Sequence, residues 1–364
     1  MMPRAGDLGA RLYRGEVSYD FVGKRRLWYG VSAVLILVSV LGLGLRGLNL
    51  GVEFSGGAVF TVNQAGLGVD EVTEATEAVE GMEEPEVQTL GEDRVRVRVG
   101  DLSSQEANEA KVLLAEELGL PADDVDAQVI GPSWGDQISE RALIGIAVFL
   151  VLVVAYLSLA FEWKMAAGAI IALFHDIVLT VGIYALVGFE VTPATVTGLL
   201  TILGYSLYDT VVVFDKVKEN TRGITARATQ TISEAANLAV NQTLVRSINT
   251  TLVALLPVVA LLVVGVGILG AGVIQDLALV LFVGMATGAY SSIFLAAPLY
   301  AALKEREPAS IALAKRVASR RAADRRKSAE RASGATDGAD DDPDDDDTES
   351  PRDTLPAARA GRRK

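Results

Sequence analysis

Asp209 is a carboxylate within a long apolar run, several residues before the first charged side chains that follow it. A carboxylate near the centre of a bilayer costs roughly 2.5 kcal/mol or more, so it needs a functional or a pairing reason. Desolvation favours the protonated form of such a group, and an arginine that approaches favours the ionised form. Arg246 opens a later apolar run and is the candidate partner. We therefore predict a switchable proton site; the alternative is a static ion pair that fixes helix packing.

Other polar side chains follow the same helical spacing. Asp176 is followed at steps of four by Thr180 and Tyr184, and it stands beside His175, the single histidine. Thr197, Thr201, Tyr205 and Asp209 form a second set at the same spacing. Because residues four apart share a helix face, each set forms a stripe that should face the other stripe or a wet cavity. The residues that we assign to a proton route or a polar network in the bundle are His175, Asp176, Thr201 and Tyr205. Glycines at 168, 182, 198 and 204 should let the third and fourth helices approach closely.

The composition excludes most enzymatic chemistry. The chain has 364 residues and no cysteine, so it has no disulfide, thiol nucleophile or thiolate metal site. One histidine allows no multi-histidine metal cluster, and no base–nucleophile set or phosphate loop is present. We predict no enzyme activity, no metal and no cofactor. Residues 46–138 hold 20 Asp/Glu against 5 Lys/Arg, a balance of −15 within a total of −13, which argues against nucleic-acid binding.

Half of the residues are hydrophobic, and they gather in runs of about the 20 residues that cross a bilayer as a helix. The excess of Lys/Arg in alternate connections places both termini in the cytosol. The predicted organisation is a cytosolic amino-terminal segment, a first helix, an outer domain, five further helices with a cytosolic connection at 215–247, and a charged, largely disordered cytosolic tail. These parts cover residues 1–26, 27–45, 46–140, 141–300 and 301–364.

The segment after the first helix is long enough to fold as a domain. Alternating residues predict strands at 58–62, 87–90, 94–99 and 125–130, and helical spacing predicts helices at 69–79 and from Ser103 or Ser104 to 118. The order β-α-β-β-α-β is that of an α+β ferredoxin-like domain. Gly91–Asp93 should form a turn, and the glycines of Gly51–Gly57 should form a bend.

The tail changes in charge along its length. Residues 304–331 are basic and can form a surface helix, whereas Asp340–Asp347 is a like-charge block that should be disordered. Basic residues beside a membrane attract anionic lipid at about 1 kcal/mol each, so the tail either contacts lipid or is simply solvated.

Five segments together resemble the SecF family of protein-export membrane subunits. They are Gly51–Gly57, His175–Asp176, Gly204–Asn220, Asn241–Arg246 and Gly288–Phe294. The resemblance implies a multi-pass protein of the bacterial plasma membrane that uses the proton motive force to complete preprotein export. It also implies a SecD-like subunit, the SecYEG channel and an unfolded preprotein as partners, with membrane lipid and no nucleic acid.

By the same resemblance, Asp209 is the proton-carrying aspartate and Arg246 the arginine that gates it. Two positions depart from the family pattern, Glu53 in place of aspartate and Tyr208 in place of asparagine. Tyr208 puts the hydrogen bonding around Asp209 in question. Two other functions fit the same residues: a proton-driven small-molecule efflux transporter, and a scaffold that transports nothing.

Overall fold

The computed structural model describes residues 11, 14, 17–63, 66–82, 85–90, 94–100, 102–264 and 272–334. The predicted Gly91–Asp93 turn and the Asp340–Asp347 block lie outside these residues. Six helices in the described part are long and apolar enough to cross a membrane, as predicted. They are α2 (Arg25–Arg46), α6 (Pro132–Ala160), α7 (Trp163–Val187), α8 (Pro193–Thr221), α10 (Ile232–Val264) and α11 (Gly272–Ser291), the last continued by a π-helical turn, η3 (Ser292–Ala296), and by α12 (Ala297–Glu305).

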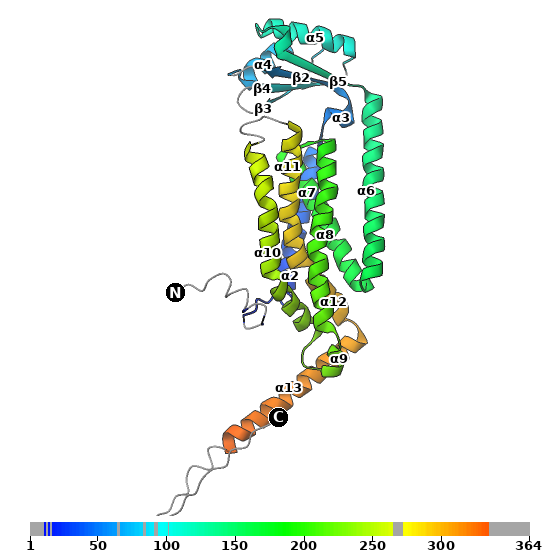
Figure 1. Cartoon of the computed structure of the whole chain (residues 1–364), viewed down its shortest axis with the longest axis vertical. Coiled ribbons are helices and arrows are strands. Elements are labelled where there is room, and N and C mark those ends of the chain that lie inside the picture. Colours follow the sequence, from blue (N-terminus) through cyan, green and yellow to red (C-terminus); the bar gives the residue numbers. More distant parts are fainter. Residues whose placement is uncertain are drawn as a thin grey trace, which may run out of the picture. The chain divides into compact units, whose positions relative to one another are not determined.

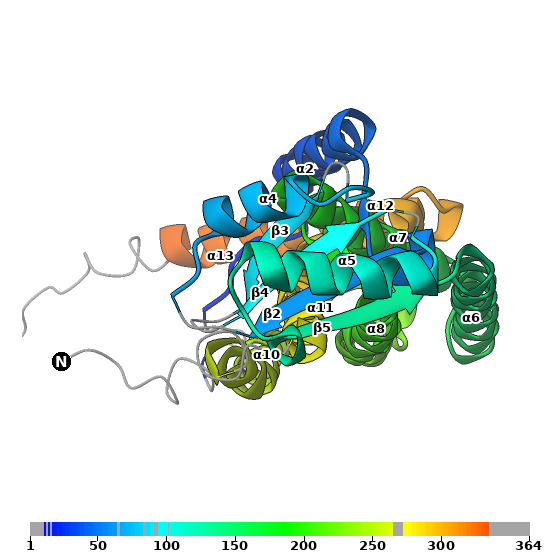
Figure 2. The same cartoon turned by 90° about the horizontal axis from the view of Figure 1, so that it is seen from above.

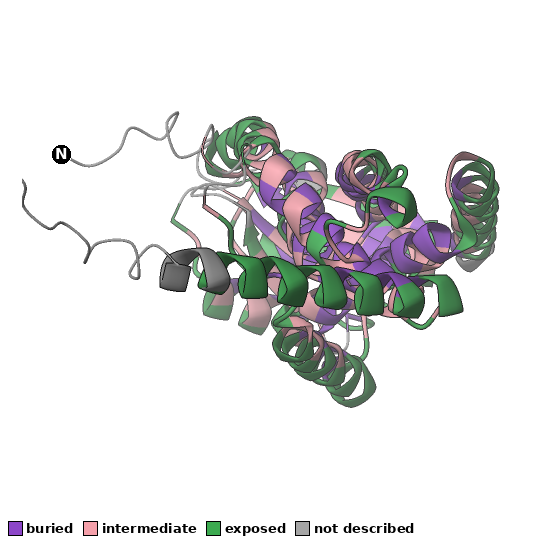
Figure 3. Ribbon diagram, turned by 90° about the horizontal axis from the view of Figure 1, so that it is seen from below, coloured by how far each residue is buried: buried purple, intermediate pink, exposed green. Residues whose placement is uncertain are grey.

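The helices extend past the apolar runs that predicted them. Thr192 caps α8 and Pro193 is its first residue, so this helix begins where the sequence indicates. Its other end runs into the predicted cytosolic connection, where a short helix, α9 (Ile224–Arg227), precedes α10. Figure 3 shows buried residues where the helices meet and exposed residues on their outward faces, as expected for helices that face lipid.

A four-stranded antiparallel sheet follows the first helix and carries two helices on one face (Figures 1 and 2). The strand order is β3-β4-β2-β5, so the predicted ferredoxin-like α+β arrangement is confirmed. Serine 103 opens the second helix with a capping box that it forms with Glu106. The elements are β2 (Gly57–Asn63), α4 (Val69–Glu77), β3 (Glu86–Leu90), β4 (Arg94–Val99), α5 (Ser104–Glu117), the 3-10 turn η1 (Ala122–Asp124) and β5 (Val125–Ile130).

Strand β4 divides its side chains between two environments. Its valines are buried in the core beneath α4 and α5, and its arginines, alternating with them, are half-buried. Because successive side chains of a strand point to opposite faces, Arg96 and Arg98 lie on the face away from these helices. There they meet Glu190, from the connection between α7 and α8.

A second, two-stranded sheet ties the chain after α2 to that same connection. Strand β1 (Asn49–Leu50) pairs in parallel with β6 (Glu190–Val191), and a short helix, α3 (Val52–Ser55), follows. A Cβ at Gly51 would lie 2.5 Å from Glu53 Oε2, so this glycine leaves room for the carboxylates. Gly57 has a φ of +124°, and a Cβ there would lie 2.6 Å from Val99 O. The predicted bend thus has two steric causes.

Of the four glycines predicted to bring the third and fourth helices together, Gly168 alone does so, because a Cβ there would lie 3.5 Å from Phe214 Cζ of α8; for the other three the prediction is wrong. A methyl group at Gly182 would overlap Ser39 of α2, and one at Gly198 would overlap Val280 of α11. Gly168 faces the backbone of η3, where a Cβ would lie 3.3 Å from Ala296 O. Around Gly204 no atom outside its own stretch of helix lies within 4 Å of such a Cβ. The spacing of small residues thus predicts where a helix makes close contacts, but it does not predict which helix is the partner.

The last described helix is α13 (Pro308–Gly334), and beyond Ala314 it belongs to a separate unit of the chain. Glu307, the residue before α13, forms two ion pairs, with Oε1 2.6 Å from Lys164 Nζ and Oε2 3.3 Å from Lys304 Nζ. The hydrogen bond from Lys164 lowers the pKa of Glu307, and Lys304 adds to this effect.

Candidate functional site

Asp209 lies in the interior of the helix bundle, where α8 meets α10 and η3. The residue is 8 % exposed. Ser247 Oγ donates a hydrogen bond of 2.6 Å to Oδ1, and Ser292 Oγ donates one of 2.6 Å to Oδ2. No lysine or arginine among the described residues forms an ion pair with this carboxylate. Asp209 is therefore held by neutral hydroxyl groups.

Asp176 on α7 has a similar environment. The residue is 2 % exposed, and its Oδ2 accepts hydrogen bonds from Ser206 Oγ at 2.6 Å and from Ser291 Oγ at 2.8 Å. Its Oδ1 lies 3.3 Å from Nδ1 of His175. Two buried carboxylates on neighbouring helices thus each receive two serine hydroxyl groups.

Two consecutive serines join these carboxylates. Ser291 is the last residue of α11 and Ser292 is the first residue of the π-helical turn η3. Consecutive helical side chains point about 100° apart, so one serine reaches α7 while the next reaches α8. Isolated π turns inside helices occur frequently at functional sites. The turn therefore connects Asp176 and Asp209 through adjacent residues.

Arg246 does not lie at Asp209 in this structure, so the static ion pair that we gave as the alternative is not formed here. Its side chain is exposed, and Nη2 donates a hydrogen bond of 2.9 Å to the hydroxyl of Tyr208. The guanidinium carbon is 5.9 Å from the centre of the Tyr208 ring. Ser247, the next residue on α10, occupies the place beside the carboxylate. Tyr208 is thus the partner of Arg246 and makes no hydrogen bond to Asp209.

The predicted stripe on α8 also turns away from the bundle. Thr201 is exposed, and its hydroxyl donates to the carbonyl of Thr197 at 2.9 Å, so it takes no part in the carboxylate network. Each step of four residues rotates about 40° past a full turn, which carries Thr201 about 80° away from Asp209. Tyr205, one step away, is half-buried and packs at the edge of an apolar cluster. The inward face instead carries Ser206.

His175 links the network to the first helix. Its ring stacks on Tyr290 at 5.8 Å, and the hydroxyl of Tyr290 lies 3.1 Å from Ser32 Oγ on α2. Its Nε2 is buried and has no hydrogen-bond partner among the described residues. His175 and Asp176 are thus brought together as their adjacency suggested. Within the same residues no group of three or more His, Cys, Asp or Glu side chains could hold a metal ion.

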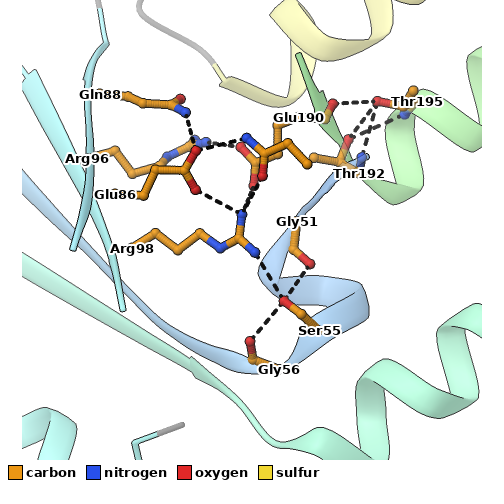
Figure 4. Close-up of polar contacts among 11 residues, drawn as sticks. Gly51, Ser55, Gly56, Glu86, Gln88, Arg96, Arg98, Glu190, Thr192 and Thr195 are labelled. Carbon is orange, nitrogen blue, oxygen red and sulfur yellow. Dashed lines mark hydrogen bonds and ion pairs between the residues drawn. The ribbon is translucent and has the colours of Figure 1, made fainter. Parts of the chain in front are cut away.

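A second polar cluster lies at the opposite end of α8, between the outer sheet and the helices (Figure 4). Glu190 Oε2 is 3.5 Å from Arg96 Nη1, and its Oε1 is 3.9 Å from Arg98 Nη1. Arg98 also pairs with Glu86 at 3.2 Å and donates to Asn49 Oδ1 at 3.0 Å. The cluster joins the sheet, the segment after α2 and the start of α8.

Glu190 is the least accessible carboxylate of this cluster, with a side chain 12 % exposed. Burial raises the pKa of Glu190, and the two arginines lower it by a smaller amount. The cluster borders a cavity of about 260 Å³ that Glu53, Thr61, Arg96 and Asp276 also line. This end of the molecule therefore holds a carboxylate whose charge depends on how tightly the sheet and the helices are packed.

The sequence reasoning found both buried carboxylates and missed their four serine partners. A single serine within an apolar run does not stand out in the hydropathy pattern, because single serines are common in helices that cross membranes. Three of them stand inside quoted segments: Ser206 in Gly204–Asn220, and Ser291 and Ser292 in Gly288–Phe294. Ser247 follows directly after Asn241–Arg246. Their position in or beside the segments that resemble the SecF family is the sequence feature that could have identified these serines.

Two family models match the chain. The model described as protein export membrane protein SecD/SecF, C-terminal, matches residues 113–306, and the SecD/SecF GG motif matches residues 42–63. The chain is 54 % identical to the protein translocase subunit SecF of Streptomyces coelicolor, over 88 % of this chain and 86 % of that protein. It is 42 % identical to SecF of Mycobacterium tuberculosis, over 86 % and 73 % of the two chains.

A solved structure has the same fold. It is that of SecDF, a translocon-associated membrane protein from Thermus thermophilus, with a TM-score of 0.70 and 28 % identity. The match covers 82 % of this chain and 42 % of the SecDF chain, so the present chain spans less than half of that longer protein.

Proposed function

Since the chain belongs to the SecD/SecF family of protein-export membrane proteins, as one of its SecF subunits, we propose that it uses the proton motive force to complete preprotein export, with Asp209 as the proton-binding group. The observation that carries this proposal is the setting of Asp209, buried among three helical elements with neutral partners alone. A group with such partners can change its charge without breaking an ion pair.

Arg246 supplies the second state of the proposed cycle. It is adjacent to Ser247, so a rotation of α10 by about 100° would exchange the serine hydroxyl for the guanidinium beside Asp209. The ionised carboxylate would favour the arginine, and the protonated one would favour the serine. The hydrogen bond to Tyr208 holds Arg246 in the position that the structure shows.

Helix α8 provides the mechanical connection. Asp209 lies within it, and its first residue, Pro193, follows two residues after the β6 strand that pairs with β1. A shift of α8 that follows protonation therefore moves Glu190 against Arg96 and Arg98 of the outer sheet. In the proposed cycle this motion lets the outer domain hold an emerging unfolded polypeptide against backsliding.

The partners follow from the family and from the match to a longer chain. SecDF joins in one chain a region similar to this chain and a further region that the match does not cover. We propose that a SecD-like subunit supplies that region, and that the pair works beside a SecYEG-type channel in the bacterial plasma membrane. Both termini lie in the cytosol, because the basic residues gather on that side.

Export in membrane vesicles tests the role of Asp209. Asp209→Asn keeps the size of the side chain and removes its ability to exchange a proton, so completion of export should no longer respond to a proton gradient. Asp215→Asn is the matched control, because Asp215 lies on the same helix, is exposed, and should export like the wild type. Proton-dependent export by assembled Asp209→Asn at the wild-type rate would exclude Asp209 as the coupling site.

A further inference from the structure

Asp176 is a buried carboxylate that the proposed role of Asp209 leaves without a task. Both of its oxygen atoms have partners, and the residue is 2 % exposed. The titratable side chain beside it is His175 on its own helix, with Tyr290 stacked on His175 from α11. From α8 and α11 the groups that contact its oxygen atoms are the hydroxyls of Ser206 and Ser291. No described lysine or arginine pairs with it.

Ser291 and Ser292, at the junction of α11 and the π turn, can each hydrogen-bond to a carboxylate in either of its protonation states. Ser291 Oγ lies 2.8 Å from Asp176 Oδ2 and 3.2 Å from the carbonyl of Gly288. Ser292 Oγ lies 2.6 Å from Asp209 Oδ2 and 3.2 Å from the carbonyl of Ala289. Each hydroxyl has one hydrogen and can accept a hydrogen bond as well. Each therefore has two acceptors in reach for a single hydrogen.

This geometry defines what happens when a carboxylate gains a proton. The ionised oxygen accepts the serine hydrogen, and the backbone carbonyl goes without it. When a proton binds to Oδ2, the new O–H donates to the serine oxygen, and the serine hydrogen rotates to the carbonyl three residues earlier. No bond of the serine breaks, and one proton is taken up from water.

We propose that Asp176 is a second proton-binding carboxylate of the transport cycle, and that Ser291 and Ser292 couple its protonation to that of Asp209. Hydrogen bonds to an ionised group are about twice as strong as neutral ones, so both carboxylates anchor the turn most firmly when ionised. Protonation of either one loosens the same turn and thereby changes the proton affinity of the other. The proposal rests on the proposed use of protons by this subunit.

The titratable and charged groups nearest Asp209 do not themselves connect it to Asp176. Tyr205 and Tyr208 lie on its own helix, and Arg246 on α10 is held by Tyr208. The groups that contact its carboxylate from α10 and η3 are hydroxyls. Asp176 is also linked to α8 through Ser206, which stands three residues before Asp209. Substitutions of Ser291, which leave Ser206 in place, therefore identify the route by which the two carboxylates are coupled.

Infrared difference spectra of the full-length protein, reconstituted with its SecD-like subunit, test the proposal. Among the protonated-carboxyl bands that appear when the wild type is acidified, one should be lost in Asp176→Asn and another in Asp209→Asn. Coupling is reciprocal, so each substitution should change the proton affinity of the remaining carboxylate by the same factor, about fivefold or more. Failure of Asp209 alone to titrate would contradict the proposed function and leave the assignment of Asp176 standing.

Serine variants supply the second arm. In Ser291→Ala the two carboxyl bands should titrate independently, whereas Ser291→Thr keeps the hydroxyl and should retain the coupling. Ser39→Ala is the control, because this buried serine on α2 bonds to neither carboxylate. A spectrum in which Asp176→Asn removes no band, or unchanged coupling in assembled Ser291→Ala, would overturn the proposal.

Discussion

Asp209 and Arg246 lie on neighbouring helices, and each is hydrogen-bonded to another residue: Asp209 to Ser247, and Arg246 to Tyr208. Tyr208 accepts from Arg246 at 2.9 Å, and Ser247 donates to Asp209 at 2.6 Å. Adjacent residues on each helix thus pair in two separate contacts. Tyr208, which departs from the family pattern, therefore affects the position of Arg246 and makes no hydrogen bond to Asp209.

The Tyr208→Phe substitution removes one hydrogen bond to a guanidinium and keeps the ring. A net hydrogen bond contributes about 1 kcal/mol, so arrangements in which Arg246 reaches Asp209 should become about fivefold more populated. An arginine at the carboxylate opposes proton binding, and proton flux through the reconstituted complex should fall by up to about fivefold. Tyr156→Phe, an exposed tyrosine on α6, is the control. Equal flux in Tyr208→Phe and wild type would show that this bond does not restrain the arginine.

The charged residues of the candidate site could be predicted from the sequence, but their hydrogen-bond partners could not. The cost of a charge in a membrane singles out Asp176, Asp209 and Arg246 in any reading of the sequence. The hydroxyl group that hydrogen-bonds to each carboxylate is decided by a helix rotation equivalent to a single residue. A spacing of four residues does not define that rotation, because a helical turn has 3.6 residues. Thr201 was misplaced for that reason, and Ser247 was overlooked.

Glu190 makes the contact between α8 and the outer sheet sensitive to pH. Burial raises its pKa above the ordinary glutamate value, so the packed junction binds a proton more tightly than an open one. Its contribution is therefore fully present below the ordinary pKa and is lost as pH rises through the raised value. Acidification on the outer side should favour the packed junction.

The protection factor of the Gly51 amide, which donates to Val191 O at 2.9 Å, reports this junction in hydrogen exchange. It should fall as pH rises through the raised pKa of Glu190. Glu190→Gln imitates the protonated side chain and should make the protection independent of pH, whereas Glu86→Gln, at a more exposed carboxylate, should keep the wild-type dependence. Protection that increases with pH in the wild type would reverse the sign argued here.

Elements with a strong local pattern could be predicted closely. The strands Arg94–Val99 and Val125–Ile130 have the predicted limits, because alternation and flanking turns specify them locally. The π-helical break at Ser292 could not be predicted, because residues 273–300 read as one continuous apolar helix. The parallel pairing of β1 with β6 could not be predicted either, because two-residue strands 141 residues apart in the sequence leave no periodic signal.

Within the described residues, six helices that can span a membrane and one outer sheet organise the molecule. The sequence contains no cysteine, so a single introduced thiol reports its own side of the membrane without background. Asp70→Cys in the outer domain should react with an impermeant thiol reagent added to intact cells. Lys218→Cys at the end of α8 should react after the membrane is opened. Labelling of the second variant in intact cells would reverse the proposed orientation.

The proposed passage of protons through Asp209 is tested most directly by proton uptake into vesicles that contain the complete complex and an unfolded preprotein. With a gradient imposed, we expect substrate-dependent uptake by the wild type and by Asp215→Asn, and uptake by Asp209→Asn no greater than that of protein-free vesicles. Uptake by Asp209→Asn at the wild-type rate, in complexes shown to be assembled, would contradict this proposal.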